Sequence, residues 1–313
     1  MDVVAFGEAM VLLLADPGRS LRTAETFRRS VAGAEVNVAV GMARLGHAVG
    51  WVGVLGEDAF GDVVLRSLRA EGIDLSRVRR DPAPTGVLIR DSHPERPTEV
   101  LYYRRHSAGS RLAAADVDAE YIGAARILHV SGVTSAISAT AHQAVLRVVQ
   151  VARDAGVTVC FDPNVRRRLW SVQQAAQTLT EVAGMADIVL AGADEAMLLS
   201  GSDDTGTAAS WFLECGAHTV VVKDGVAGSW GTDGSATWHQ PAMPTTTVDA
   251  VGAGDAYAAG FLSARLRGLP LNRSMAEAAV VAGMSVQVAT DMDGLPTAVE
   301  RDAMLSETRE VRR

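Results

Sequence analysis

The chain has 313 residues, of which 48% are hydrophobic, and a formal net charge of −8 from 29 basic and 37 acidic residues. This length allows one large domain or two modest ones with a substantial core, and the apolar content excludes a disordered chain. An acidic chain without a basic cluster is a poor candidate for binding the phosphate backbone of nucleic acids. We therefore expect a globular protein without a nucleic-acid partner.

Cysteine usage and the N-terminal sequence indicate a cytoplasmic protein. The two cysteines, Cys160 and Cys215, are too few for a disulfide scaffold in a chain of this size. The N-terminus carries an acid at Asp2 and no basic region, so it does not resemble a signal peptide. No run of about 18 apolar residues occurs, so we expect no membrane-spanning segment. No spacing of His and Cys is typical of a zinc site.

Short strand-like runs alternate along the chain with longer stretches of helical period. The predicted strands are 3–6, 49–56, 126–132, 157–162, 187–192 and 219–225. The first two predicted helices are 36–46 and 60–73. The last four strands are continuous apolar runs, which is typical of a sheet covered on both faces. The pattern predicts an α/β fold with a doubly wound parallel sheet.

Two segments interrupt this alternation. Residues 12–32 have only a weak helical pattern, and residues 84–105 contain two strand-like runs around a proline-rich turn. We expect both to form antiparallel strands outside the main sheet, as a small β-sheet lid. The predicted organisation is an α/β domain of residues 1–11, 33–83 and 106–313, with the lid formed by 12–32 and 84–105.

The stretch TVDAVGAGDAYAAGF (247–261) connects a β-like run, 245–249, to a predicted helix. Gly252 and Gly254 allow unusual backbone conformations and let a ligand approach the main chain closely. Backbone N–H groups at a helix N-terminus, with the positive end of the helix dipole, form an anion site. Asp255 would lie at the mouth of that site.

Four kinds of element share the composition of this stretch. Asp255 could be a helix cap. A dinucleotide fingerprint fails because position 257 is tyrosine and no βαβ unit follows. A Walker loop fails because the only lysine, Lys223, is followed by an aspartate. In a non-Walker kinase, the N–H groups of Gly252, Ala253 and Gly254 would stabilise the transferring phosphoryl group, and Asp255 would accept the proton of the acceptor hydroxyl. A carboxylate suffices as that base because the transition state is largely dissociative.

The residues 249–260 resemble the C-terminal signature of the ribokinase (PfkB-type) carbohydrate kinases, with Ala250 in place of the usual threonine. Residues 33–46 and 53–62 resemble the N-terminal signature of that family, and the resemblance extends over nearly the whole chain. It implies a ribokinase-like, Rossmann-type three-layer sandwich with a β-sheet lid. It also implies an ATP-dependent kinase that phosphorylates a sugar or a sugar acid.

Within this family, the sequence is most similar to the 2-keto-3-deoxygluconate kinases. The similar segments are 7–18, 33–37, 102–110, 128–134 and 162–170. The resemblance implies substrate contacts from Gly33, Ala34, Asn37, Tyr102, Arg104, Arg166, Asp255 and Asp291. Arginine binds carboxylates through paired hydrogen bonds, so Arg104 and Arg166 are the candidates for recognising a sugar acid. From the pattern alone, a solvated lid strand explains Tyr102 and Arg104 equally well.

The resemblance also implies a nucleotide site. Its predicted residues are Asn164, Gly192, Glu195, Lys223, Gly225, Gly228, Gly252 and Gly254. ATP phosphates require Mg²⁺, which Glu195 would hold through water, although Gly192 stands where the family has asparagine. Asp249 is the candidate for a loop that binds a monovalent cation such as K⁺. The segment 223–228 alone would indicate only a hairpin turn.

Two departures from the 2-keto-3-deoxygluconate kinases concern the sugar pocket. Leu88 stands at a lid position where some of them have tyrosine, and Ala32 precedes Gly33 where the family has a Gly-Gly pair. Other acceptors therefore stay open, such as 5-dehydro-2-deoxygluconate, fructose or ribose, and so does a non-catalytic sugar-binding regulator. The apolar residues of 100–104 on the lid predict a homodimer or a higher homo-oligomer.

Overall fold

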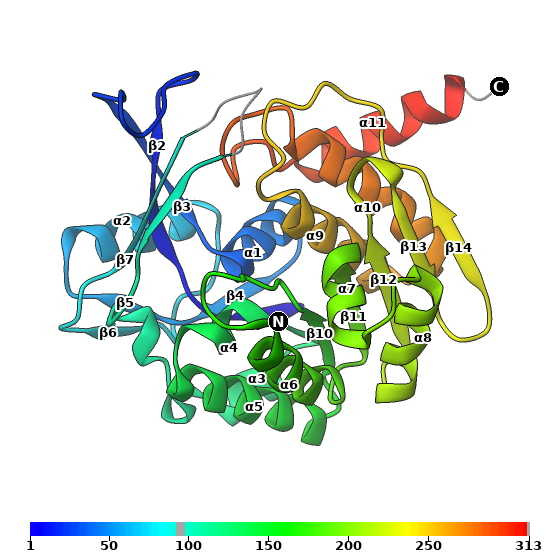
Figure 1. The fold of residues 1–313 in the computed structure, drawn as a ribbon, viewed down its shortest axis with the longest axis horizontal. Helices are drawn as coiled ribbons and strands as arrows, with labels where there is room; N and C mark the ends of the chain where they lie inside the picture. Colours follow the sequence, from blue (N-terminus) through cyan, green and yellow to red (C-terminus); the bar gives the residue numbers. More distant parts are fainter. Residues whose placement is uncertain (92–97, 312–313) are drawn as a thin grey trace.

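The computed structural model describes residues 1–91 and 98–311, with side chains up to residue 306. Its centre is an eight-stranded sheet (Figure 1). In spatial order its strands are β14 (Thr237–Gln240), β13 (Ser229–Thr232), β12 (Thr219–Lys223), β11 (Ile188–Gly192), β10 (Thr158–Asp162), β9 (Ile127–Ser131), β1 (Val3–Phe6) and β4 (Val49–Val52). Neighbours from β4 through β12 are parallel, and β13 and β14 form an antiparallel hairpin at one edge. The expected parallel α/β sheet is confirmed.

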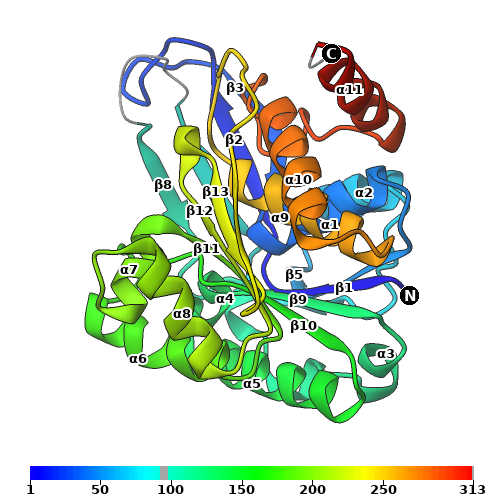
Figure 2. The ribbon, with the colours of Figure 1, turned by 90° about the vertical axis from the view of Figure 1, so that its right-hand side faces the viewer.

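Helices cover both faces of this sheet (Figure 2). One layer contains α1 (Ala34–Arg44), α2 (Ala59–Ala70), α9 (Ala253–Leu266), α10 (Leu271–Ser285) and α11 (Ala298–Val311). The other contains α3 (Ala119–Gly123), α4 (Gly132–Ile137), α5 (Ala139–Asp154), α6 (Val172–Ala183), α7 (Ala193–Ser200) and α8 (Thr205–Cys215). Successive strand residues point to opposite faces, so Ala5 packs in the core with α1 and α9, whereas Phe6 packs with α5. The expected three-layer sandwich is confirmed.

A second, four-stranded sheet lies outside the main one, and we call it the small sheet. Its order is β3 (Phe27–Ala32), β2 (Met10–Ala15), β7 (Gly86–Arg90) and β8 (Val100–Tyr103). The pairs β2–β3 and β7–β8 are antiparallel, but β2 and β7 are parallel, so the expectation of antiparallel strands throughout is wrong. The chain leaves the main sheet along β2 and returns along β3, and it leaves again along β7 and returns along β8. The two outgoing strands, β2 and β7, therefore run in the same direction. The expected proline-rich turn lies outside the described residues.

Two further expectations about strands are wrong. The predicted strand 49–56 is divided into β4 and β5 (Val54–Gly56), and β5 pairs with β6 (Arg79–Asp81) in a separate two-stranded sheet. Residues 245–249, which are all described, form no strand. The N–H groups of Val248 and Asp249 both donate to the single carbonyl of Val286, so no ladder can form. Within residues 1–91 and 98–311 there are also three 3₁₀ turns: η1 (Gly109–Arg111), η2 (Ala114–Asp116) and η3 (Gly225–Ala227). No helix among the described residues is both long and apolar enough to cross a membrane.

The helix α9, which carries Asp255, is enclosed by α1 and α10. At Gly260, an added Cβ would lie 2.9 Å from the Cα of Ala278 and from the Cβ of Val281 on α10. On the other side, an added Cβ at Gly41 of α1 would lie 2.6 Å from the Cβ of Ala259. Glycines at these contacts let the three helices approach closely, which fixes the position of the α9 N-terminus.

We expect Gly260→Val to lower the free energy of unfolding by about 1–3 kcal/mol, because the new side chain must push α9 away from α10. Urea unfolding followed by circular dichroism measures this change. Gly184→Ala is the matched control: Gly184 has a φ of −66°, and its nearest neighbours lie at 3.5 Å or more. That variant is expected to stay within about 0.5 kcal/mol of the unmodified chain. Equal stabilities of the two variants would contradict the packing argument.

Candidate active site

A cavity of about 910 Å³ lies where the carboxyl ends of β10, β11 and β12 face the small sheet and the start of α9. Crevices at this edge of an open α/β sheet are the usual ligand sites. Its lining contains the predicted site residues Gly33, Ala34, Asn37, Tyr102, Arg104, Asn164, Arg166, Gly192, Glu195, Lys223, Gly225, Gly228, Gly252, Ala253, Gly254, Asp255 and Asp291. Leu88 and Ala32, the two departures, line it as well. The described lining does not include Asp249.

The glycine turn is the N-terminus of α9. Gly252 is the N-cap residue with a φ of 84°, a left-handed conformation that favours glycine, and an added Cβ would lie 3.0 Å from the carbonyl oxygen of Asp291. The first turn of a helix leaves backbone N–H groups without intrahelical acceptors. Of the predicted donors, Ala253 already donates to the carbonyl of Ala250 at 3.3 Å. The N–H groups of Gly252, Gly254 and Asp255 have no such backbone acceptor and are therefore the best donors for an anion.

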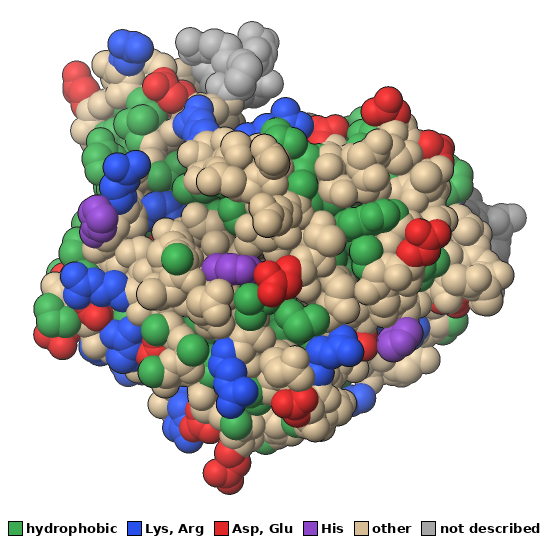
Figure 3. Space-filling view, turned by 60° about the horizontal axis from the view of Figure 1, so that its bottom comes forward, with side chains coloured by type: hydrophobic (Ala, Val, Ile, Leu, Met, Phe, Trp, Pro, Cys, Tyr) green, Lys and Arg blue, Asp and Glu red, His purple; other side chains and the backbone are tan. Residues whose placement is uncertain are grey.

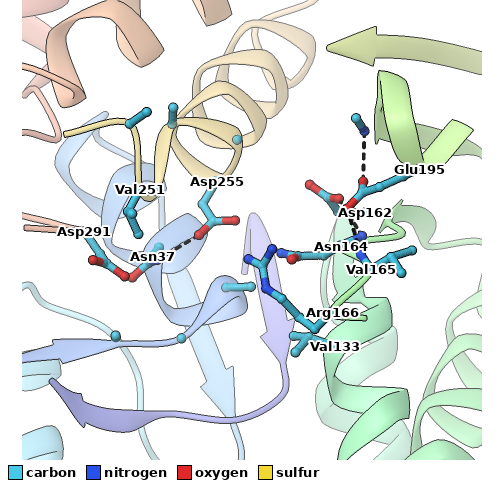
Figure 4. Close-up of a pocket in the computed structure, with 18 of the residues that line it drawn as sticks. Asn37, Val133, Asp162, Asn164, Val165, Arg166, Glu195, Val251, Asp255 and Asp291 are labelled. Carbon is cyan, nitrogen blue, oxygen red and sulfur yellow. Dashed lines mark hydrogen bonds between the residues drawn. The ribbon is translucent and has the colours of Figure 1, made fainter. Parts of the chain in front are cut away.

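Asp255 is not the cap of this helix, because the N-cap is Gly252 and Asp255 is the third residue after it. Its side chain points into the cavity (Figure 4), where the Nδ2 of Asn37 donates to Oδ2 at 2.7 Å. Burial raises the pKa of Asp255 to about 7, and the hydrogen bond from Asn37 opposes that rise. A carboxyl group with a pKa near neutrality can accept a proton at the operating pH, as a general base must.

Lys223 lies beside the glycine turn. Its Nζ donates to the Oδ2 of Asp162 at 2.6 Å, and an added Cβ at Gly254 would be 3.4 Å from that Nζ. Burial alone would lower the pKa of Lys223, but Asp162 and Glu195 outweigh it and the pKa is raised. The ammonium group therefore stays charged next to the anion site. The sequence reasoning missed Asp162, although it ends an apolar strand at the carboxyl edge of the sheet.

Glu195 is held by the backbone on both of its oxygens. Oε1 accepts from the N–H of Val165 at 2.7 Å, and Oε2 accepts from the N–H of Gly192 at 2.9 Å. Its pKa is raised, chiefly by burial and then by Asp162. The described residues contain no cluster of three or more His, Cys, Asp or Glu side chains that could hold a metal ion. A Mg²⁺ ion held mainly by phosphates and water, with Glu195 as an outer partner, agrees with this arrangement.

The two candidate arginines differ in their surroundings. Arg104 is buried, forms an ion pair with Glu8, and lies over the ring of Tyr102 with 5.7 Å between the guanidinium carbon and the ring centroid. Arg166 is exposed and points into the cavity (Figure 4), and its charge lowers the pKa of Asp255. Arg166 is therefore the more available of the two for an anionic ligand.

Asp249 takes part in a charge cluster behind the glycine turn. The Nη1 of Arg90 donates to its Oδ2 at 2.5 Å, and the N–H of Val251 donates to its Oδ1 at 3.0 Å. Arg90 also donates to the Oδ1 of Asp291 at 3.0 Å. The sequence reasoning missed Arg90. The alternation of side chains along a strand indicates its position: Arg90 is two residues from Leu88 and so faces the same side of β7 as that cavity residue.

Comparison with known proteins agrees with this geometry. The family model described as pfkB family carbohydrate kinase matches residues 1–298. The chain belongs to this family. It is accordingly an ATP-dependent carbohydrate kinase, and the predicted enzyme class is confirmed.

Relatives within the pfkB family align over nearly the full chain. A 2-dehydro-3-deoxygluconokinase of Bacillus subtilis is 38% identical, with 99% of this chain and 97% of the relative covered. A 2-dehydro-3-deoxygalactonokinase of Haloferax volcanii is 32% identical, with 96% of each chain covered. The crystal structure of a PfkB protein from Polaromonas sp. JS666 is 38% identical, has a TM-score of 0.89, and covers 97% of this chain and 99% of that one.

We expect turnover to follow the ionisation of Asp255. Below pH about 7 this carboxyl group is protonated and cannot accept a proton, so kcat/KM should rise roughly tenfold per pH unit and level off above that pH. Initial rates with saturating ATP measure the profile. Asn37→Ala removes a hydrogen bond that lowers the pKa of Asp255, and should shift the rise to higher pH.

Gln150→Ala is the control for that shift, because it removes an amide that donates to Asp154 on the surface. Its profile should coincide with that of the unmodified enzyme. A flat profile from pH 5 to 9 in the unmodified enzyme would contradict the assignment of Asp255 as the base.

Proposed function

We propose that this kinase transfers the γ-phosphoryl group of ATP to the 6-hydroxyl group of 2-keto-3-deoxygluconate, also named 2-dehydro-3-deoxygluconate. The observation that carries the proposal is the exposed guanidinium of Arg166 in the same cavity as the buried carboxylate of Asp255. A sugar acid needs both groups: a cation for its carboxylate and a base for its hydroxyl. The full-length similarity to the Bacillus subtilis 2-dehydro-3-deoxygluconokinase supports the same acceptor.

In the proposed reaction, Asp255 accepts the proton of the acceptor hydroxyl as the oxygen attacks phosphorus. The turn formed by Gly252, Ala253 and Gly254 faces the transferring phosphoryl group and stabilises its negative charge. Lys223 lies beside this turn. Positioning and charge stabilisation supply most of the catalysis in phosphoryl transfer. Gly33, Ala34, Asn37, Tyr102, Arg104, Arg166 and Asp291 line the acceptor side of the cavity, and Arg166 binds the carboxylate of the sugar acid.

The nucleotide occupies the opposite side of the cavity in this proposal, against Asn164, Gly192, Lys223, Gly225 and Gly228. When bound, Mg²⁺ neutralises phosphate charge, and Glu195 would hold its water ligands. The small sheet acts as the lid, with the segments 12–32 and 84–105 as its excursions from the α/β domain. Closure of this lid over the cavity excludes water, which would otherwise compete as the phosphoryl acceptor. An enzyme that uses ATP in this way fits a cytoplasmic location.

A panel of acceptors tests the proposed function. ADP release should be fastest with 2-keto-3-deoxygluconate, and slow or absent with its galactonate epimer, 5-dehydro-2-deoxygluconate, fructose and ribose. Arg166→Ala should raise the KM for a sugar acid by about 10-fold or more, the scale of a lost charge-assisted hydrogen bond, and change the KM for a neutral sugar little. Arg105→Ala is the matched control, because Arg105 is an exposed arginine close in sequence to Arg104.

The outcomes of this panel separate the alternatives. If a neutral sugar or another keto acid is turned over faster than 2-keto-3-deoxygluconate, that compound is the acceptor and the proposed one is wrong. If Arg166→Ala raises the KM equally for acidic and neutral sugars, Arg166 binds phosphate and not the carboxylate of the sugar acid. Binding of a sugar without ADP release would support a non-catalytic regulator. Asp255→Asn serves as the inactive reference, with turnover lowered by about 10²-fold or more.

We infer that the outer face of the small sheet joins two copies of the chain. Phe27 on β3 and Leu101 and Tyr103 on β8 are exposed, and Tyr103 as a residue is 63% exposed. Exposed apolar groups on a small sheet favour association. Light scattering after gel filtration should give a dimer or a multiple of it, and Tyr103→Asp should reduce it to a monomer. Val299→Asp, at an exposed apolar residue of α11, is the control that should leave the assembly unchanged. A monomeric unmodified chain would refute this inference.

A further inference from the structure

A buried arginine from the small sheet lines the cavity and contacts the loop that leads into the glycine turn. Arg90 ends β7 and is only 1% exposed. Its Nη1 donates to Asp249, and its Nη2 donates to the Oδ1 of Asp291 at 3.0 Å and to the carbonyl oxygen of Ala289 at 3.3 Å. One guanidinium therefore joins three segments: the small sheet, the loop that precedes α9, and the loop that precedes α11.

The oxygens around Arg90 are the kind that a metal cation would take. Two carboxylates and a backbone carbonyl converge behind the anion site, and hard cations prefer such oxygen ligands. Here a guanidinium occupies that position. Burying a charge is costly unless it is paired, so the two buried carboxylates and the arginine stabilise one another. A further cation would meet the positive charge of Arg90 and carboxylates that are already engaged. The residues around Asp249 therefore do not fit K⁺.

The contacts of Arg90 lead to both reactive elements of the site. Asp249 also accepts from the N–H of Val251, the residue before the Gly252 N-cap, so the pair with Arg90 orients the glycine turn. Asp291 lies beside Asn37, which donates to Asp255 (Figure 4). Burial raises the pKa of Asp291, and Arg90 is the largest influence that lowers it. Arg90 thus opposes the rise in the pKa of Asp291 that burial causes, next to the base's hydrogen-bond donor.

We propose that Arg90 is a built-in cation, so that phosphoryl transfer by this enzyme requires no monovalent metal ion. Arg90 is a positioning residue in this role: it acts through Asp249 on the glycine turn and through Asp291 on the pair Asn37–Asp255. The inference rests on the proposed kinase reaction.

The unmodified enzyme provides the first test. Its kcat and KM are measured at constant ionic strength in KCl, NaCl and tetramethylammonium chloride. We expect kcat to differ by less than about 2-fold among the three salts, since a true effector coupling is about 5-fold or more. A rise of that size in KCl would overturn the inference. The melting temperature without substrates should also be the same in KCl and tetramethylammonium chloride, because an ion that binds the folded state raises it.

The variant Arg90→Ala provides the second test. Removing the guanidinium leaves two carboxylates and a carbonyl around an empty position, which a K⁺ ion can then enter. In tetramethylammonium chloride, kcat should fall by about 10-fold or more, the lower part of the range for such couplings, with a smaller change in KM. KCl should restore part of kcat, and tetramethylammonium chloride at equal ionic strength should not.

Arg301→Ala is the matched control, because Arg301 is also buried and pairs with Asp302 and Glu277 away from the cavity. It should lose stability without any response of kcat to K⁺. If Arg90→Ala behaves in the same way, Arg90 is only a structural bridge and the inference fails. If Arg90→Ala does not fold, the salt comparison of the unmodified enzyme still tests whether the reaction requires a monovalent metal ion.

Two failures remain distinguishable. Absence of turnover with every acceptor in every salt would refute the proposed function. A melting temperature that rises in KCl without substrates would refute the built-in cation alone, because that measurement needs no turnover.

Discussion

The cost of burying charge governs this cavity. It gathers carboxylates where a phosphorylated nucleotide and its phosphoryl acceptor would have to meet, and each buried carboxylate requires a partner. Asp162 pairs with Lys223, Glu8 pairs with Arg104, and Arg90 pairs with two acids at once. Asp255 differs from these ion pairs, because its hydrogen-bond partner is the neutral amide of Asn37. Burial raises the pKa of Asp255 and outweighs the hydrogen bond from Asn37 and the charges of Arg166 and Lys223, which lower it.

The fold explains why these charges can be held apart. Lys223 and Asp162 come from adjacent parts of one sheet edge, Asp255 comes from a helix enclosed by two others, and Arg90 comes from the small sheet. The two buried cations Arg90 and Lys223 therefore lie on different sheets. The outer surface carries a mixture of acidic and basic groups without a dominant sign on the face in Figure 3. The concentration of paired charge is thus a property of the cavity and of the contacts behind it.

Local sequence predicted much of this molecule. Continuous apolar runs predicted the parallel sheet, and the stretch 249–260 predicted both the turn and its aspartate, because backbone freedom at glycine and helix termini are local properties. Long-range pairs could not be predicted in the same way. Arg90 and Asp249 are separated by 159 positions, and only the three-dimensional fold brings them together. Residues 245–249 misled the strand prediction because β-propensity acts only where a neighbouring strand is available.

The only lysine of the chain has a consequence of its own. Surface acetylation, methylation and amine-directed cross-linking depend on exposed ammonium groups, and here the single ε-amino group lies in the cavity, hydrogen-bonded to Asp162. Apart from the N-terminus, the exterior presents its positive charge through guanidinium groups alone. Apart from the N-terminal amine, amine chemistry applied to this protein therefore reports on one place, the interior of the site where phosphate would bind.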